Sequence, residues 1–323
     1  MTVSNDTIRA ALPHRLDRVE LSGLGPTHAG KVRDAYVLAD GRRIIVTSDR
    51  VSAFDQVLGT IPFKGQVLNQ LAAWWFEQTA DLVDNHVLSV PDPNVLLARD
   101  ATPLPVEVIV RGYITGVTST SLWTLYEQGI DRPYGLDLPT GLQKNDALPE
   151  PVITPTTKAE AGAHDERLTS AEVVSRGLVA PDLWRRVCQT ALAVFRRGQQ
   201  IAHDRGLILV DTKYEFGLVG DQLVLIDEVH TPDSSRYWIA SSYAESKTTG
   251  KPPEHFDKEL LRQWLKSQGY SGDGPFSGIP DDVAVRLASH YIAVYERLTG
   301  EAFVPGVQPT LDRIAGAIRA EIL

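Results

Sequence analysis

The stretch "LVDTKYEFGL" (residues 209–218) places Asp211, Lys213 and Glu215 at every second position of an otherwise apolar run. In a β-strand, residues two apart share one face. The pattern therefore predicts a strand with three charged side chains on one side and apolar side chains, such as Phe216, packed on the other. Because an isolated buried charge is costly, these charges need partners.

A second apolar run, "LVLIDEVH" (223–230), follows a turn at 219–222, so the two runs predict a β-hairpin. Mg²⁺ takes one or two carboxylates and shares its other sites with water and substrate phosphates. Glu215 and Asp227 suit that role, and Lys213 could neutralise them or reach a phosphate. From this pattern alone, an internal ladder of salt bridges is an equally good interpretation.

The hairpin also carries a geometric prediction. Directly opposite residues of an antiparallel pair share a face, and side chains alternate along each strand. A two-residue turn at Gly220-Asp221 would therefore put Asp227 on the face opposite to Glu215. For both carboxylates to reach one ion, the sequence predicts a loop of odd length or a bulge in one strand.

Several cations interrupt apolar or loop sequence elsewhere. Arg111 breaks the strand pattern "VEVIVRGYI", and Arg236 closes "HTPDSSR". An arginine fork matches phosphate or carboxylate oxygens, although either arginine alone is as well explained by a salt bridge. Lys31, in "HAGKVRD", and Lys144, in "LQKND", are weak signals by themselves. His230 is either a metal ligand or a hydrogen-bonded structural residue. Together with the carboxylates, these groups are typical of an ATP-dependent phosphoryl-transfer site.

The remaining sequence predicts an α+β fold, with strands dominating early and helices late. A hairpin is expected around Asp40-Gly41, and residues 132–170 are expected to lack regular structure. The Pro-rich segment 89–105 is the predicted domain boundary, which gives a β-rich domain at 1–102 and an α+β domain at 103–323. Predicted helices cover 66–80, a long stretch from Pro181 to about Gly206, and about 255–267, 281–299 and 309–322.

Composition excludes several classes of protein. The 323 residues carry a net charge of −9, which argues against nucleic acid or an anionic membrane as the main partner. Cys188 is the only cysteine, so no disulfide framework is expected. The N-terminus lacks the apolar core of a signal peptide, and no run approaches the length of a membrane span. We therefore expect a cytoplasmic protein; a monomer is the first expectation and a dimer the second.

At this point the sequence resembles a known family, the phosphoribosylaminoimidazole-succinocarboxamide synthases, or SAICAR synthetases, of purine biosynthesis. "LVDTKYEFG" and "LPVEVIVRGYITG" resemble its two signature segments. Six further segments match the family in order, and with the signatures they span most of the chain from about residue 30. They are "GKVRDAY" (30–36), "TSDRVSAFDQVL" (47–58), "FKGQVLNQL" (63–71), "KNDA" (144–147), "ITPTTKAEAGAHDE" (153–166) and "LIDEVHTPDSSRYW" (225–238).

The resemblance implies a reaction in which 5-amino-1-(5-phosphoribosyl)imidazole-4-carboxylate (a carboxyaminoimidazole ribonucleotide), L-aspartate and ATP give the succinocarboxamide, ADP and phosphate. It implies a small β-rich N-terminal domain resembling a kinase N-lobe, with ATP in the cleft before the larger domain. By carry-over from matching positions, the resemblance assigns these roles: Glu215 and Asp227 to Mg²⁺, Lys31 and Lys144 to ATP phosphates, Val32 and Arg33 to the covering loop, Lys213 and Asp211 to the reacting carboxylate, and Arg111 and Arg236 to the ribonucleotide phosphate and neighbouring anions.

The sequence departs from the family at one position. The family has Ser directly after the Thr-Gly of the arginine-containing segment, whereas Gly116 is followed here by Val117. Ser119 and Ser121 lie just beyond, and Ser119 is the first choice for a substrate-binding serine.

Two rival functions stay open at this stage. A different ATP-using enzyme, such as a small-molecule kinase on the same scaffold, would share the metal and lysine elements but would not need the Arg111 segment. A catalytically inactive nucleotide-binding protein is a rival of another class, and the intact charged positions of the hairpin argue against it.

Overall fold

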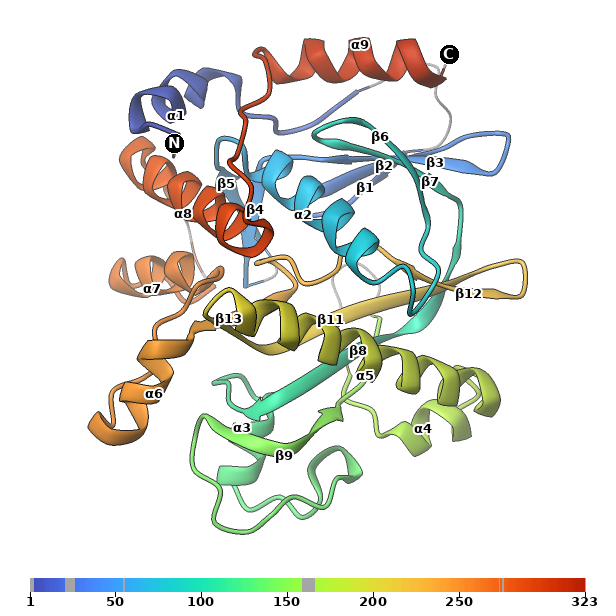
Figure 1. The fold of residues 1–323 in the computed structure, drawn as a ribbon, viewed down its shortest axis with the longest axis vertical. Helices are drawn as coiled ribbons and strands as arrows, with labels where there is room; N and C mark the ends of the chain where they lie inside the picture. Colours follow the sequence, from blue (N-terminus) through green and yellow to red (C-terminus); the bar gives the residue numbers. More distant parts are fainter. Residues whose placement is uncertain are drawn as a thin grey trace.

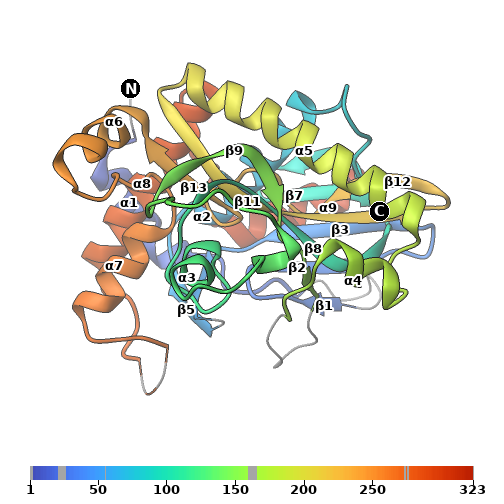
Figure 2. The ribbon, with the colours of Figure 1, turned by 90° about the horizontal axis from the view of Figure 1, so that it is seen from below.

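The computed structural model describes residues 3–20, 27–54, 56–158, 166–272, 274 and 276–322. Residues 159–165, part of one segment that carries the family resemblance, lie outside this description. Within it the chain forms an α+β structure in which two large antiparallel sheets lie one above the other, with helices packed around them (Figures 1 and 2). The predicted fold class is confirmed.

The first sheet comes from the N-terminal part of the chain and has five strands. In spatial order they are β1 (Thr27–Ala29), β2 (Arg33–Val37), β3 (Arg42–Thr47), β7 (Val95–Arg99) and β6 (Val87–Asp92). The predicted hairpin around Asp40-Gly41 is β2–β3, and Gly41 takes the positive φ of 81° that favours glycine in such a turn. A separate two-stranded sheet consists of β4 (Arg50–Ala53) and β5 (Gln56–Thr60).

The second sheet has six strands and is built around β8 (Thr102–Ile114) and β11 (Leu207–Val219), which pair with each other. Both strands are 13 residues long, so each can pair with different partners at its two ends. The partners of β8 are β9 (Asp146–Ile153) and β10 (Thr156–Thr157); those of β11 are β12 (Gln222–Ile226) and β13 (Ser235–Ile239).

Nine α-helices lie in the described part of the chain. They are α1 (Asn5–Ala11), α2 (Lys64–Gln78), α3 (Leu122–Glu127), α4 (Ser170–Ser175), α5 (Pro181–Asp204), α6 (Ala240–Thr249), α7 (Glu259–Ser267), α8 (Asp281–Thr299) and α9 (Thr310–Ile322), with single 3₁₀ turns at Leu12–His14 and Pro133–Gly135. None of these helices is long and apolar enough to cross a membrane.

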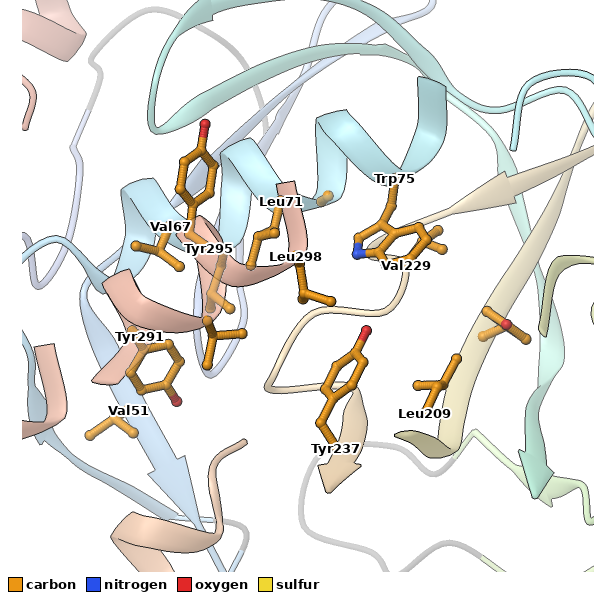
Figure 3. Close-up of a cluster of buried hydrophobic side chains, with 14 of the residues drawn as sticks. Val51, Val67, Leu71, Trp75, Leu209, Val229, Tyr237, Tyr291, Tyr295 and Leu298 are labelled. Carbon is orange, nitrogen blue, oxygen red and sulfur yellow. The ribbon is translucent and has the colours of Figure 1, made fainter. Parts of the chain in front are cut away.

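The main hydrophobic core lies between helices α2 and α8 and the second sheet. Figure 3 shows α2 and α8 side by side, with side chains from both reaching toward the sheet. Along α2, Val67, Leu71 and Trp75 recur every four residues and are fully buried, as the periodicity predicts. Tyr237 and Leu209 meet this face from the second sheet. Burying each such side chain stabilises the fold by roughly 2–3 kcal/mol.

The C-terminal helix returns to the N-terminal sheet. Ile314 and Ile318 of α9 are buried against Tyr36, Ile44 and Val46 of β2 and β3, and Figure 1 shows the helix lying over that sheet. The last residues of the chain thus complete the core of the first sheet. The division at residues 102/103 and the likeness to a kinase N-lobe stay predictions.

Several boundaries differ from those predicted. Helix α2 begins and ends two residues earlier than 66–80, and α7 begins at Glu259 instead of 255. The expectation for 132–170 was wrong, because residues 146–153 form β9 on the edge of β8. The alternating burial that marks a strand is weak in β9, so the local sequence pattern does not predict it. Backbone pairing with the long strand β8 stabilises this strand instead.

Candidate active site

Asp211 lies in the middle of the second sheet, between two arginines. In the strand register it stands opposite Arg111 of β8 on one side and Arg236 of β13 on the other. Its Oδ2 accepts from Nη1 of Arg111 at 3.1 Å, and Oδ1 lies 3.6 Å from Nε of Arg236. Arg111 also donates to the hydroxyl of Thr154 at 2.9 Å. The structure therefore brings together three predicted residues from distant parts of the chain.

Lys213 and Glu215 follow Asp211 on the same face of β11. Nζ of Lys213 donates to Glu215 and to Glu107 of β8, each at 2.7 Å. Lys158 donates to the other oxygen of Glu215. Burial alone would raise the pKa of Glu215, but the ammonium groups of Lys213 and Lys158 outweigh it and bring the pKa to about 2. Phe216 and Tyr214 point into the core and are fully buried, so the predicted two-faced strand is present.

The predicted loop of odd length is wrong. Val219 pairs with Gln222 across a two-residue turn at Gly220-Asp221, and Glu215 pairs with Ile226 without a shift of register between β11 and β12. Gly220 takes a φ of 59° in this turn. Strand β12 ends at Ile226, so the parity rule for opposite residues no longer applies to Asp227.

Asp227 reaches the cavity beside Glu215 by a different route. It has a left-handed backbone, with φ of 64°, directly after the strand. Asp is among the few residues that tolerate this conformation. Both carboxylates line one cavity of about 220 Å³, into which the first sheet also contributes Arg33, Ala35 and Arg43. The two carboxylates are therefore neighbours. The left-handed backbone at Asp227 brings them together, and not the register predicted for the hairpin.

Arg33 connects the two sheets at this cavity. Its Nη1 contacts Asp227 at 3.0 Å and its Nη2 contacts Glu228 at 2.8 Å. Burial raises the pKa of Asp227; Arg33 opposes that shift, while the carboxylates of Glu215 and Glu228 add to it. The negative charge of Asp227 is therefore kept at an electrostatic cost, which a bound cation would relieve.

A second, smaller cavity of about 120 Å³ lies at the Asp211 end of the strand. Its lining includes three cations, Arg236, Lys258 and Arg262, and the hydroxyl residues Ser234 and Ser235. Glu215 lies four positions after Asp211 in β11, or roughly 13 Å along the strand. One charged strand face thus connects two cavities, each of which is lined by both cations and carboxylates.

The other predicted residues are more scattered. Lys31 is exposed, and Val32 is half-buried, in the loop before β2. Lys144 is exposed just before β9, next to Asn145, which bonds to Ile114. Since Ile114 is at the far end of β8 from Glu107, Lys144 lies roughly 20 Å along the strand from the Glu215 end.

The serine expected to bind substrate is not singled out by the geometry. Ser119 is exposed in the loop after β8. Ser121 is buried, and its hydroxyl bonds to the carbonyl of Thr118 and to the hydroxyl of Thr124, which gives it a structural role at the start of α3. Its close approach to Gly116 leaves no room for a side chain there, since an added Cβ would lie 2.3 Å from that of Ser121.

His230 has the structural role that was the alternative to metal binding. It is fully buried and bonds through Nε2 to the hydroxyl of Tyr214. Burial lowers the pKa of its imidazole to about 3, so the ring is neutral.

A buried charge cluster beside the smaller cavity was not predicted from the sequence. Nζ of Lys64 lies 2.9 Å from Asp233, although the lysine is fully buried at the first turn of α2. Asp233 also accepts from Tyr291 at 2.6 Å and pairs with Lys258 at 3.3 Å. A signal was present, because a cation at a helix N-terminus is unfavourable for the helix dipole and needs another partner. Lys158 was also missed as a partner of Glu215.

Paired carboxylates with lysines and arginines, at a cavity between two sheets, are typical of enzymes that transfer phosphoryl groups between small molecules. Residues 26–275 match the family model for SAICAR synthetase. A relative from Agrobacterium fabrum is 51% identical over 291 residues, which are 90% of this chain and 92% of the relative. A phosphoribosylaminoimidazole-succinocarboxamide synthase of Legionella pneumophila (strain Lens) is 48% identical, covering 90% of this chain and 93% of its own. The chain belongs to the SAICAR synthetase family.

Solved structures agree with this assignment. SAICAR synthase from Saccharomyces cerevisiae, in complex with SAICAR, superposes with a TM-score of 0.78 and 34% identity over 89% of this chain and 99% of the yeast chain. A type-2 SAICAR synthetase in complex with ADP has a TM-score of 0.65 and 23% identity, and covers 86% of this chain and 100% of its own. The second comparison supports the fold.

Proposed function

We propose that this protein is the ATP-dependent ligase that joins 5-amino-1-(5-phosphoribosyl)imidazole-4-carboxylate to L-aspartate, giving SAICAR, ADP and phosphate. The observation that carries the proposal is the charged face of β11, which holds Asp211 between two arginines at one end and Glu215 beside Asp227 at the other. The small-molecule kinase, the main rival, needs only the carboxylate end. The relatives named above carry the name of this activity or, in yeast, were solved with its product.

The chemistry requires both ends of the strand. A carboxylate is a poor electrophile, so its oxygen first attacks the γ-phosphorus of ATP while the bond to ADP breaks. The aspartate amine then attacks the acyl carbon of the resulting acyl phosphate, and a C–N bond forms as phosphate leaves and the nitrogen loses a proton. Lys213 stabilises the negative charge that develops on the transferring group. Asp211 holds the side chain of Arg111 in place beside the reacting carboxylate.

The residues at the larger cavity fit Mg²⁺. Glu215 and Asp227 would hold the ion, and burial with neighbouring carboxylates already disfavours the charge on Asp227. Among the described residues no group of three or more His, Cys, Asp or Glu side chains could hold a metal alone, so substrate phosphates and water would complete the shell. When bound, Mg²⁺ would neutralise the phosphate oxygens during transfer. Arg33 pairs with Asp227 and Lys158 with Glu215. When Mg²⁺ binds, these two cations would share the carboxylates with the ion or release them to it.

The nucleotide and the ribonucleotide would occupy opposite ends of the strand. Lys31, Val32 and Arg33 would cover the ATP phosphates from the first sheet. Lys144 is kept as an ATP contact only through its family match, since the fold sets it at the far end of β8.

The ribonucleotide phosphate and neighbouring anions would be held by Arg236, which lines the smaller cavity, and by Arg111, which pairs with Asp211 at the wall of that cavity. Ser119 is retained as a substrate contact.

An ADP-release assay with each substrate omitted in turn tests the proposal. We expect ADP only when ATP, the ribonucleotide and aspartate are all present. ADP release without aspartate would favour a kinase on this scaffold. ATP binding by calorimetry without any turnover would favour an inactive nucleotide-binding protein. The cytoplasm as compartment and the monomer as assembly stay predictions, and gel filtration with light scattering tests the second.

A further inference from the structure

The loop before β2 has its carbonyl groups held on one side. The Gly30 and Lys31 oxygens accept from Nη2 and Nε of Arg50 at 3.1 and 3.0 Å. The Val32 oxygen accepts from the amide and the hydroxyl of Ser48 at 2.9 and 2.5 Å. Because a trans peptide carries its N–H opposite its C=O, the N–H groups of Lys31 and Val32 point the other way.

Arg50 is itself fixed from several directions. The residue is 3% exposed. Its guanidinium makes a two-pronged contact with Asp34, through Nη2 at 2.8 Å and Nη1 at 3.2 Å, and Nη1 also donates to the carbonyl of Asp17. All three guanidinium nitrogens are therefore engaged, and only a planar fork satisfies the loop, the carboxylate and Asp17 at once.

The N-terminal segment 16–19 is hydrogen-bonded to Asp34 and Asp49, the residues around Arg50. The backbone of Leu16 exchanges two hydrogen bonds with Asp49, at 2.8 and 2.7 Å, and the amide of Val19 donates to Asp34 at 3.4 Å. This segment precedes residue 26, where the match to the family model begins. Segment 16–19 thus supports the loop from outside the part of the chain that matches the family model.

We infer that Arg50 is a positioning residue for the nucleotide, which holds the carbonyls of Gly30 and Lys31 inward so that the loop presents its N–H groups to the ATP phosphates. Successive backbone N–H groups in a turn form a concavity that binds anions. Gly30 allows the tight geometry, because an added Cβ would lie 2.8 Å from the carbonyl oxygen of Arg33. The inference rests on the proposed function in that the anion is ATP.

The test is Arg50→Lys, which keeps the charge and removes the fork. We expect the KM for ATP to rise at least tenfold, with the KM values for the ribonucleotide and aspartate changing less than twofold. Arg42→Lys is the matched control, since Arg42 forms an exposed ion pair with Asp40 at the tip of the β2–β3 hairpin; its KM values should match the unaltered enzyme. An unchanged KM for ATP, or an equal rise in all three KM values, would overturn the inference.

Amide exchange in the unaltered protein covers the case in which Arg50→Lys does not fold. We expect added ATP to slow exchange at Lys31 and Val32 at least tenfold, and equal rates with and without ATP would refute the proposed loop orientation. Both outcomes are independent of ligase turnover. If the unaltered protein binds ATP with this protection but releases no ADP with all substrates present, the proposed function fails while the inferred orientation of the loop stands.

Discussion

Glu215 and Asp227 face one cavity but are placed there by opposite means. Glu215 sits inside a regular strand, where alternation alone fixes its side, and two lysines hold its pKa at about 2. Asp227 lies just past a strand end, on a left-handed backbone, and its pKa is raised by burial and by neighbouring carboxylates. One carboxylate stabilises the fold without a ligand, whereas the other is kept at a cost that a bound cation would offset.

The largest expected effect tests what the two carboxylates share. Glu215→Gln and Asp227→Asn should each lower turnover by on the order of a thousandfold, because each removes a predicted ligand of the metal. Steady-state ADP release measures this. Glu107→Gln is the matched control, since Glu107 also bonds Lys213 but is not a predicted metal ligand, and it should keep at least a tenth of the activity. Either site variant keeping that much would separate its carboxylate from the metal role.

The next effect tests where the two carboxylates differ. At pH 7, Glu215→Gln should destabilise the protein by about 3 kcal/mol, because the pKa shift of Glu215 from 4.5 to about 2 is lost. Asp227→Asn should leave stability unchanged or raise it. Urea unfolding without ligands measures both, and equal destabilisation by the two variants would contradict the contrast.

The same contrast predicts the pH dependence. A lowered carboxyl pKa gives stability that is present above the unfolded value of 4.5 and is lost as pH falls toward 2. The difference between the unaltered protein and Glu215→Gln should therefore shrink across this window. A difference that stays constant down to pH 2 would mean that the ion pairs of Glu215 do not stabilise the fold.

A third prediction contrasts the carboxylate end of β11 with its arginine end. Arg111→Ala or Arg236→Ala should raise the KM for the ribonucleotide by roughly 30-fold or more, on the order of 2 kcal/mol, with a much smaller change for ATP. Steady-state kinetics with each substrate varied separately measures this. An equal rise in both KM values would remove the distinction between the two ends.

The smallest effect isolates the backbone of Asp227. Asn tolerates a left-handed conformation better than Ala, so Asp227→Ala should be less stable than Asp227→Asn by about 1 kcal/mol. Asp221 is exposed in the same hairpin and does not have a positive φ, so its Ala and Asn variants should differ by less than about 0.5 kcal/mol. If the two variants of residue 227 were equally stable, strain at the strand end would not explain its placement.

The long periodic elements were predictable because their signals are local. Helices α5 and α8 match their predicted ranges closely, and the hairpin of β2 and β3 follows its Asp-Gly turn. Strand β9 was missed, since it pairs with β8 along an edge and has little alternation of its own. The loop length of the β11–β12 hairpin was also mispredicted. The rule that opposite residues share a face holds only while both strands continue, and β12 ends at Ile226, before Asp227.

The sequence by itself determined that Asp211, Lys213 and Glu215 share a face, because side-chain alternation follows from the backbone of each strand. Only the tertiary structure decided which groups meet that face. Lys158 reaches Glu215 from the segment after β10, and Glu107 reaches Lys213 from β8; no periodicity in the sequence predicts either contact. Such pairings form between residues far apart in the chain, where burial makes an unpaired charge unfavourable and so selects the partner.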